Sequence, residues 1–162
     1  MKDKAELKGI GGWLILVAIG VTLGPFIAVG MDYAIYSEVF SEEVWSTLTD
    51  SNNIATYTPN YSLAVSVELV ASIIIDAYLF RLMFLFYTKK LDFPSLYIKL
   101  VYVIFAFIIL DIIMVSLVFP NSTAKDLFDP FTIRAIFQSI FSILVWVPYM
   151  KKSVRVKNTF IN

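Results

Sequence analysis

The chain has 162 residues, of which 59% are hydrophobic and 16% are charged, whereas soluble domains carry about 45–50% apolar and about 25% charged residues. This composition argues against a soluble globular protein. The formal net charge of zero gives no basic surface for nucleic acid, and the absence of cysteine and histidine excludes disulfides, thiol chemistry and Cys/His metal sites.

Four apolar segments are each long enough to cross a membrane. They cover about residues 10–31, 61–87, 98–119 and 131–150. A bilayer needs about 20 apolar residues in helical form, and backbone groups in hydrocarbon must be hydrogen-bonded within the segment, which favours helices over strands. We therefore predict an all-α protein, an integral membrane bundle of four transmembrane helices that forms a single membrane domain over residues 1–162.

Basic residues predict how this bundle is oriented, because cytoplasmic connections of membrane proteins are enriched in lysine and arginine. Ten of them lie before the first segment, around the connection between the second and third, and after the fourth: Lys2, Lys4, Lys8, Lys89, Lys90, Lys99, Lys151, Lys152, Arg155 and Lys157. The opposite side holds only Lys125. Both ends of the chain are therefore predicted to be cytoplasmic.

The first outer connection, residues 32–60, is long and acidic. Ser41 can cap a short helix whose first turn holds Glu42 and Glu43, where the helix dipole favours anions. A short helix on the membrane surface and an irregular acidic loop both fit this pattern. In the next connection, Phe93-Pro94 is expected to end any helix.

Four ionisable residues lie at membrane depth and form a candidate polar site: Glu68, Asp76, Asp111 and Arg134. Such a group at a helix centre costs about 2.5–3.5 kcal/mol on insertion scales, so it should face the bundle interior, a partner or water. Two interpretations stay open. Arg134 can form a buried ion pair with Glu68 or Asp111, or Asp76 and Asp111 can line a path for protons or a substrate.

Cations near the inner boundary are candidates for contact with lipid headgroups. Arg81 can extend its side chain to the headgroups from within the second segment. After the fourth segment, Lys151, Lys152, Arg155 and Lys157 would attract anionic lipid at about 1 kcal/mol per cation.

The first segment carries a pair of glycines one helical turn apart, Gly20 and Gly24. Small residues at this spacing let two helices approach closely, so we expect both glycines to lie in a helix-packing contact. Pro25 follows them and leaves the carbonyl of Val21 without its helical donor, which favours a kink there.

Both ends of the chain carry motifs. Gly11-Gly12-Trp13-Leu14 opens the first segment, and a second motif at the other end contains Trp146, Pro148, Tyr149, Ser153, Arg155, Val156, Lys157, Thr159 and Phe160. Together they resemble a family of small bacterial inner-membrane proteins catalogued as domain of unknown function number two-five-six-nine. The resemblance covers the whole length and implies four helices in the same order and a multi-pass location in the bacterial cytoplasmic membrane. It supplies no catalytic residues.

We expect a non-enzymatic function, as an accessory, scaffold or assembly subunit that acts on lipids or partner proteins. The alternative is a small oligomeric transporter or channel that uses the midplane carboxylates, although no pair of broken helices is evident. An enzyme is disfavoured because no nucleophile–base pair is visible. We expect no cofactor and no metal. The expected partners are the lipid bilayer and either another membrane protein or further copies of the chain.

Overall fold

The computed structural model describes residues 7–162, so Lys2 and Lys4 lie outside the described residues. This part of the chain contains helices and no strand: α1 (Leu14–Val39), α2 (Glu42–Thr49), α3 (Tyr61–Tyr87), α4 (Phe93–Val118), α5 (Ala124–Leu127), α6 (Pro130–Lys152) and α7 (Val154–Thr159). Four of them, α1, α3, α4 and α6, are long and apolar enough to span a membrane. The predicted all-α membrane bundle is confirmed.

The first helix begins and ends later than predicted, at Leu14 and Val39 instead of residues 10 and 31. Gly12 has a φ of +56°, a left-handed conformation that glycine adopts without strain, so the helix cannot start before it. At the other end, Asp32 does not stop the helix. The 26 residues of α1 extend about 39 Å, more than the roughly 30 Å of the hydrocarbon core.

Two prolines begin helices instead of ending them. Pro94 lies in the first turn of α4, which therefore starts at Phe93 and not at residue 98. Pro130 opens α6 in the same way. The first turn of a helix has no internal acceptor for its N–H groups, so proline loses nothing there. Asp129 accepts a hydrogen bond from the Thr132 N–H at 2.6 Å, and this bond lowers the pKa of Asp129.

The connection after α1 contains the short helix expected after Ser41. The Ser41 hydroxyl caps α2 by accepting a hydrogen bond from the Val44 N–H at 3.4 Å. Trp45 packs between Phe40 and Tyr61, with ring-centroid distances of 5.1 and 6.1 Å. Helix α2 is therefore held against the ends of α1 and α3.

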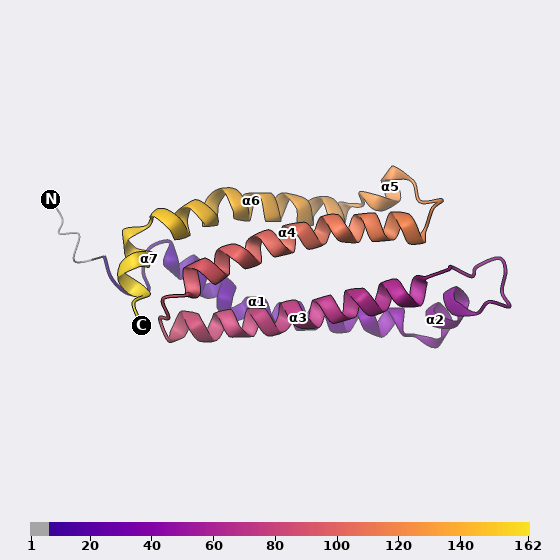
Figure 1. The fold of residues 1–162 in the computed structure, drawn as a ribbon, viewed down its shortest axis with the longest axis horizontal. Helices are drawn as coiled ribbons and strands as arrows, with labels where there is room; N and C mark the ends of the chain where they lie inside the picture. The colour runs from indigo at the N-terminus through magenta and orange to yellow at the C-terminus, as the bar shows by residue number, and fades with distance from the viewer. Residues whose placement is uncertain (1–6) are drawn as a thin grey trace.

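The four long helices form two layers, with α1 beside α3 and α4 beside α6 (Figure 1). The layers are joined where α3 packs on α4, whereas α1 and α6 are barely in contact. The helices thus form an open row, α1–α3–α4–α6. One end of the bundle, the termini end, carries the start of the described chain, the C-terminus and α7; the opposite end, the loop end, carries α2 and α5 (Figure 1).

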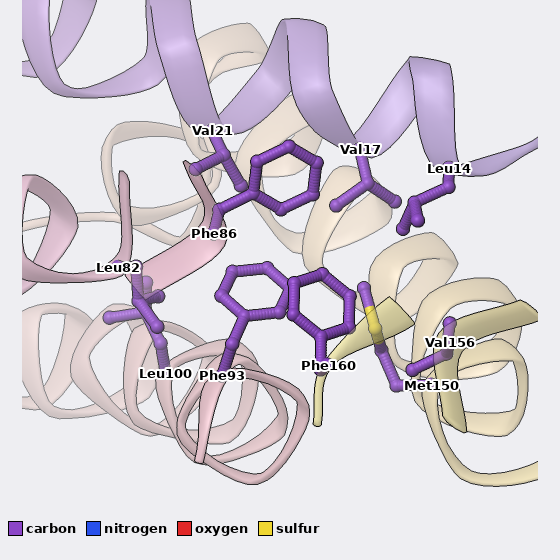
Figure 2. Packing of buried hydrophobic residues seen from close by; sticks show 10 residues of the cluster. All are labelled: Leu14, Val17, Val21, Leu82, Phe86, Phe93, Leu100, Met150, Val156 and Phe160. Atoms are coloured by element: carbon purple, nitrogen blue, oxygen red, sulfur yellow. The ribbon is translucent and has the colours of Figure 1, made fainter. Parts of the chain in front are cut away.

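The buried core lies at the termini end, where all four long helices and α7 meet (Figure 2). It consists of Leu14, Val17, Val21, Leu82, Phe86, Phe93, Leu100, Met150, Val156 and Phe160. Phe160 stacks on Phe93 with ring centroids 4.6 Å apart. These side chains close the termini end with apolar packing.

Hydrogen bonds connect the two ends of the chain beside this core. The Gly9 N–H donates to the Thr159 hydroxyl at 2.9 Å, and the Arg155 guanidinium donates to the Gly9 carbonyl at 3.4 Å. Gly11 lies under the same guanidinium, because a Cβ there would be 2.6 Å from Arg155 Nη1. We call residues 9–12 and 153–160 the terminal clasp. These contacts explain why the sequence has glycines near its N-terminal end together with Arg155 and Thr159 near its C-terminal end.

The orientation predicted from the basic residues can be tested by thiol labelling, because the chain has no cysteine of its own. Asn52 lies at the loop end and Asn162 at the termini end, and both are exposed. In intact cells, Asn52→Cys should react with an impermeant maleimide, whereas Asn162→Cys should react only after the cells are permeabilised. Labelling of Asn162→Cys from outside would reverse the predicted orientation.

Candidate functional site

A cavity of about 280 Å³ lies between the two layers and is lined by all four membrane helices. Its lining residues are Asp32, Ile35 and Tyr36 of α1, Glu68 and Ser72 of α3, Phe107, Ile108 and Asp111 of α4, and Phe131, Thr132 and Ala135 of α6. Three of them are acidic and none is basic. We call this the loop-end cavity.

Three carboxyl groups share one depth in the loop-end cavity. Asp32 precedes the end of α1 by seven residues, Glu68 follows the start of α3 by seven, and Asp111 precedes the end of α4 by seven. At about 1.5 Å per residue, each lies about 10 Å from the loop end of its helix. Since the helices exceed the hydrocarbon thickness by about 9 Å, this depth is about 5 Å inside the hydrocarbon boundary.

The polar groups of the cavity contact one another across helices. The carboxyl groups of Glu68 and Asp111 are placed for a hydrogen bond between α3 and α4. Because a carboxylate only accepts, this bond needs a proton on one of the two. On the α1 side, the Tyr36 and Ser72 hydroxyls are 3.3 Å apart, and Ser72 also lies near the Asp32 carboxyl. The cavity can therefore hold a proton and still present negative charge.

The cavity does not continue through the bundle. The apolar core of the termini end occupies the space between the helices on one side of it. In the loop-end half, Tyr61 and Val65 are buried outside that cluster, and α1 and α6 line the cavity with few close backbone contacts between them. The site is therefore a one-ended pocket at the level of the membrane interface.

The structure brings together only two of the four ionisable residues predicted for the polar site. Glu68 and Asp111 line the cavity, but Arg134 is exposed and forms no ion pair with any residue of the described chain. The predicted Arg134 clamp is therefore not formed. The cause is rotational, since Arg134 is about 100° around α6 from Ala135, which does face the cavity.

Asp76 lies outside the loop-end cavity. It lines a separate groove on the lipid-facing seam of α1 and α3, together with Asp32 and Tyr33. It follows the start of α3 by 15 residues, so it is about 22 Å from the loop end. The path predicted through Asp76 and Asp111 would have to join the groove to the cavity, two spaces that adjoin at Asp32 and Tyr36.

Of the residues predicted to contact lipid headgroups, most are exposed and one makes contacts within the fold. Exposed side chains at the termini end belong to Arg81, Lys151, Lys152 and Lys157. Arg155 instead contacts the backbone of residues 8 and 9 in the terminal clasp. Gly20 and Gly24 do not mediate packing within the bundle, because a Cβ at either would meet nothing within 4 Å.

Sequence reasoning missed three polar residues of the cavity. Asp32 and Tyr36 were assigned to a loop because the first helix was predicted to end at residue 31; their four-residue spacing places them on one helix face once α1 continues. Thr132 carries no charge and gave no signal. Asp32 also lies at the boundary between the cavity and the groove.

The fold and its surface define a class of protein. Large apolar side chains are exposed on all four long helices, including Leu16, Leu63, Leu110 and Leu144, as expected where helices face lipid. The chain is thus a multi-pass membrane protein. It belongs to the family described as "Protein of unknown function (DUF2569)", whose model matches residues 7–161. No curated protein and no solved structure matches the chain significantly.

Proposed function

We propose that the protein is a non-enzymatic accessory protein of the bacterial inner membrane that receives a cationic group of another membrane component in its loop-end cavity. The observation that supports this best is the placing of Asp32, Glu68 and Asp111 at one depth in a pocket lined by four helices. A primary or quaternary amine fits these carboxyls, and both lipid headgroups and basic side chains of proteins carry such cations.

The position of the cavity favours a membrane component over a water-borne solute. The three carboxyls lie near the level where lipid headgroups meet the acyl chains, and α1 and α6, which both line the cavity, make few close backbone contacts with each other. Ionisable groups at this depth persist where they face a partner or water. A group presented from within the membrane can therefore reach them without crossing the bundle.

Transport is the second candidate, because Glu68 and Asp111 are placed to share a proton. A transporter must also open its pocket to the other side, and the apolar core at the termini end opposes this. In proteoliposomes, we expect no pH-driven flux from the purified protein. A flux that disappears in Glu68→Gln or Asp111→Asn would favour the transporter instead.

Charge selectivity tests the cationic site directly. Ser72 lines the cavity about 16 Å from the loop end of α3. A cysteine at this position should react with a cationic methanethiosulfonate at least about tenfold faster than with an anionic one of similar size, because a cleft of one charge concentrates its counter-ions. Taking the ratio of the two rate constants corrects for how easily reagents of this size reach the cysteine at each position.

The matched control is Asn52→Cys, which lies outside the cavity and should show a much smaller ratio. Combining Ser72→Cys with Glu68→Gln and Asp111→Asn should reduce its ratio toward that control. An equal rate for both reagents at Ser72→Cys would contradict a cation-binding cavity.

A further inference from the structure

The exposed face of α6 carries two polar groups among apolar side chains. Arg134 and Gln138 are exposed one turn apart, and Phe137 and Phe141 are exposed on the same side. Arg134 and Gln138 follow the start of α6 by four and eight residues, so they lie about 6 and 12 Å from the loop end. Polar side chains at membrane depth form contacts between helices, and no helix within residues 7–162 covers these exposed side chains.

A groove of complementary charge lies on another face of the bundle, along the seam between α1 and α3. It has a volume of about 460 Å³ and contains the carboxyls of Asp32 and Asp76 together with Tyr33 and Ser37. No basic residue lines it. Asp32, Tyr33 and Ser37 are seven, six and two residues from the end of α1, which places them about 3–10 Å from the loop end.

The two surfaces match in depth as well as in charge. Between copies that are inserted in the same orientation, groups that pair must lie at the same distance from the membrane surface. Arg134 and Gln138 span about 6–12 Å on α6, and Asp32 and Tyr33 lie about 9–10 Å deep on α1. The groove holds two carboxyls and no cation among its lining residues, and the exposed guanidinium of Arg134 supplies one.

We propose that the α6 face of one copy, with Arg134 and Gln138, docks into the α1–α3 groove of a second copy. The two surfaces differ, so the contact is heterologous and joins copies head to tail into a ring or an open row. The interaction pairs Arg134 with Asp32 and places Phe137 beside Tyr33 of the next copy. It shares Asp32 with the proposed cation site but uses neither Glu68 nor Asp111, so the cross-linking test and the charge-selectivity test at Ser72 can fail separately.

Cysteine cross-linking between copies tests this arrangement. Tyr33 is 78% exposed and Phe137 is 68% exposed, and both lie about 9–10 Å from the loop end. When a Tyr33→Cys copy and a Phe137→Cys copy are co-expressed, a short bis-maleimide should join them into a dimer. Each single variant alone should stay monomeric on denaturing gels, because a heterologous contact never brings two identical positions together.

A matched control uses Leu110→Cys of α4, which is 59% exposed and lies about 12 Å from the loop end; paired with Tyr33→Cys it should give no dimer. Adding Arg134→Glu to the Phe137→Cys copy should reduce the dimer about tenfold at a limiting protein-to-lipid ratio, whereas Arg134→Lys should retain most of it. Arg134 is exposed, so these variants should fold normally, as gel filtration in detergent can verify.

Three results would overturn the proposal. The first is absence of the Tyr33–Phe137 dimer, which would leave the groove to lipid or to a different protein. The second is an equal yield from the Leu110 control, which would indicate random collision in the membrane. The third is a dimer that is insensitive to Arg134→Glu, which would mean that Arg134 only reaches headgroup phosphates.

Discussion

Replacement of Phe160 by alanine is expected to destabilise the folded protein by about 3–5 kcal/mol, the cost usual for removing a buried aromatic ring. Phe160 is 1% exposed and contacts the rings of Phe93 and Phe86 at centroid distances of 4.6 and 5.6 Å. It follows α7, outside the membrane-spanning helices, so its burial removes the ring from water and not from lipid. Equilibrium unfolding in mixed micelles measures the change.

The control for this prediction is Phe84→Ala. Phe84 lies on α3, two residues from Phe86, but its side chain is 63% exposed on the lipid-facing surface. Removing a ring that faces lipid loses neither the hydrophobic transfer from water nor a packed neighbour, so the change should stay within about 0.5 kcal/mol. Equal losses for Phe160→Ala and Phe84→Ala would show that the termini-end core does not carry the stability assigned to it.

Arg155→Ala should destabilise the terminal clasp by about 1.5–3 kcal/mol, the range for a hydrogen bond that involves a charged group. The guanidinium donates to the carbonyls of Lys8 and Gly9 at 3.5 and 3.4 Å. Among the residues of the described C-terminal tail that were predicted to contact lipid, Arg155 alone turns its side chain toward other residues of the protein. Unfolding in micelles gives the loss of stability, and hydrogen exchange at the Gly9 N–H reports opening of the clasp.

Lys152→Ala is the matched control, since Lys152 is exposed on the neighbouring turn and its loss should change the stability by no more than about 0.5 kcal/mol. Arg155→Lys should restore little, because an ammonium lacks the planar guanidinium that lies over Gly11 and Gly12 while Nη1 donates to both carbonyls. If exchange at the Gly9 N–H is accelerated as much in Lys152→Ala as in Arg155→Ala, the effect reflects the loss of positive charge at this end and not a specific clasp.

The membrane helices could be predicted because each is an uninterrupted apolar run longer than a bilayer requires. Their ends could not, for two physical reasons. Asp32 was taken as the end of the first helix, although a helix longer than the hydrocarbon core continues past a charge. Pro94 was taken as a stop, although a proline in the first turn of a helix has no bond to lose.

The candidate site was predicted only in part. Asp76 and Asp111 were placed near the midplane, but α4 begins at Phe93 and not at residue 98, so Asp111 lies nearer the loop end, at the level of Glu68 and in one cavity with it. The facing of a side chain depends on how each helix is rotated in the bundle, and one position around α6 separates Arg134 from the cavity-lining Ala135. Neither the groove beside Asp76 nor the interior wall at Thr132 follows from spacing alone.

The terminal clasp has a consequence for the synthesis of the protein. It joins positions 150 residues apart, so Leu14 and Val17 cannot complete their packing until Phe160 has been made. At a typical rate of about 5–20 residues per second, the first helix waits in the membrane for about 7–30 s. A nascent chain halted before α7 would expose an unfilled apolar surface at the termini end. This surface would distinguish the unfinished chain from the finished protein for chaperones and membrane proteases.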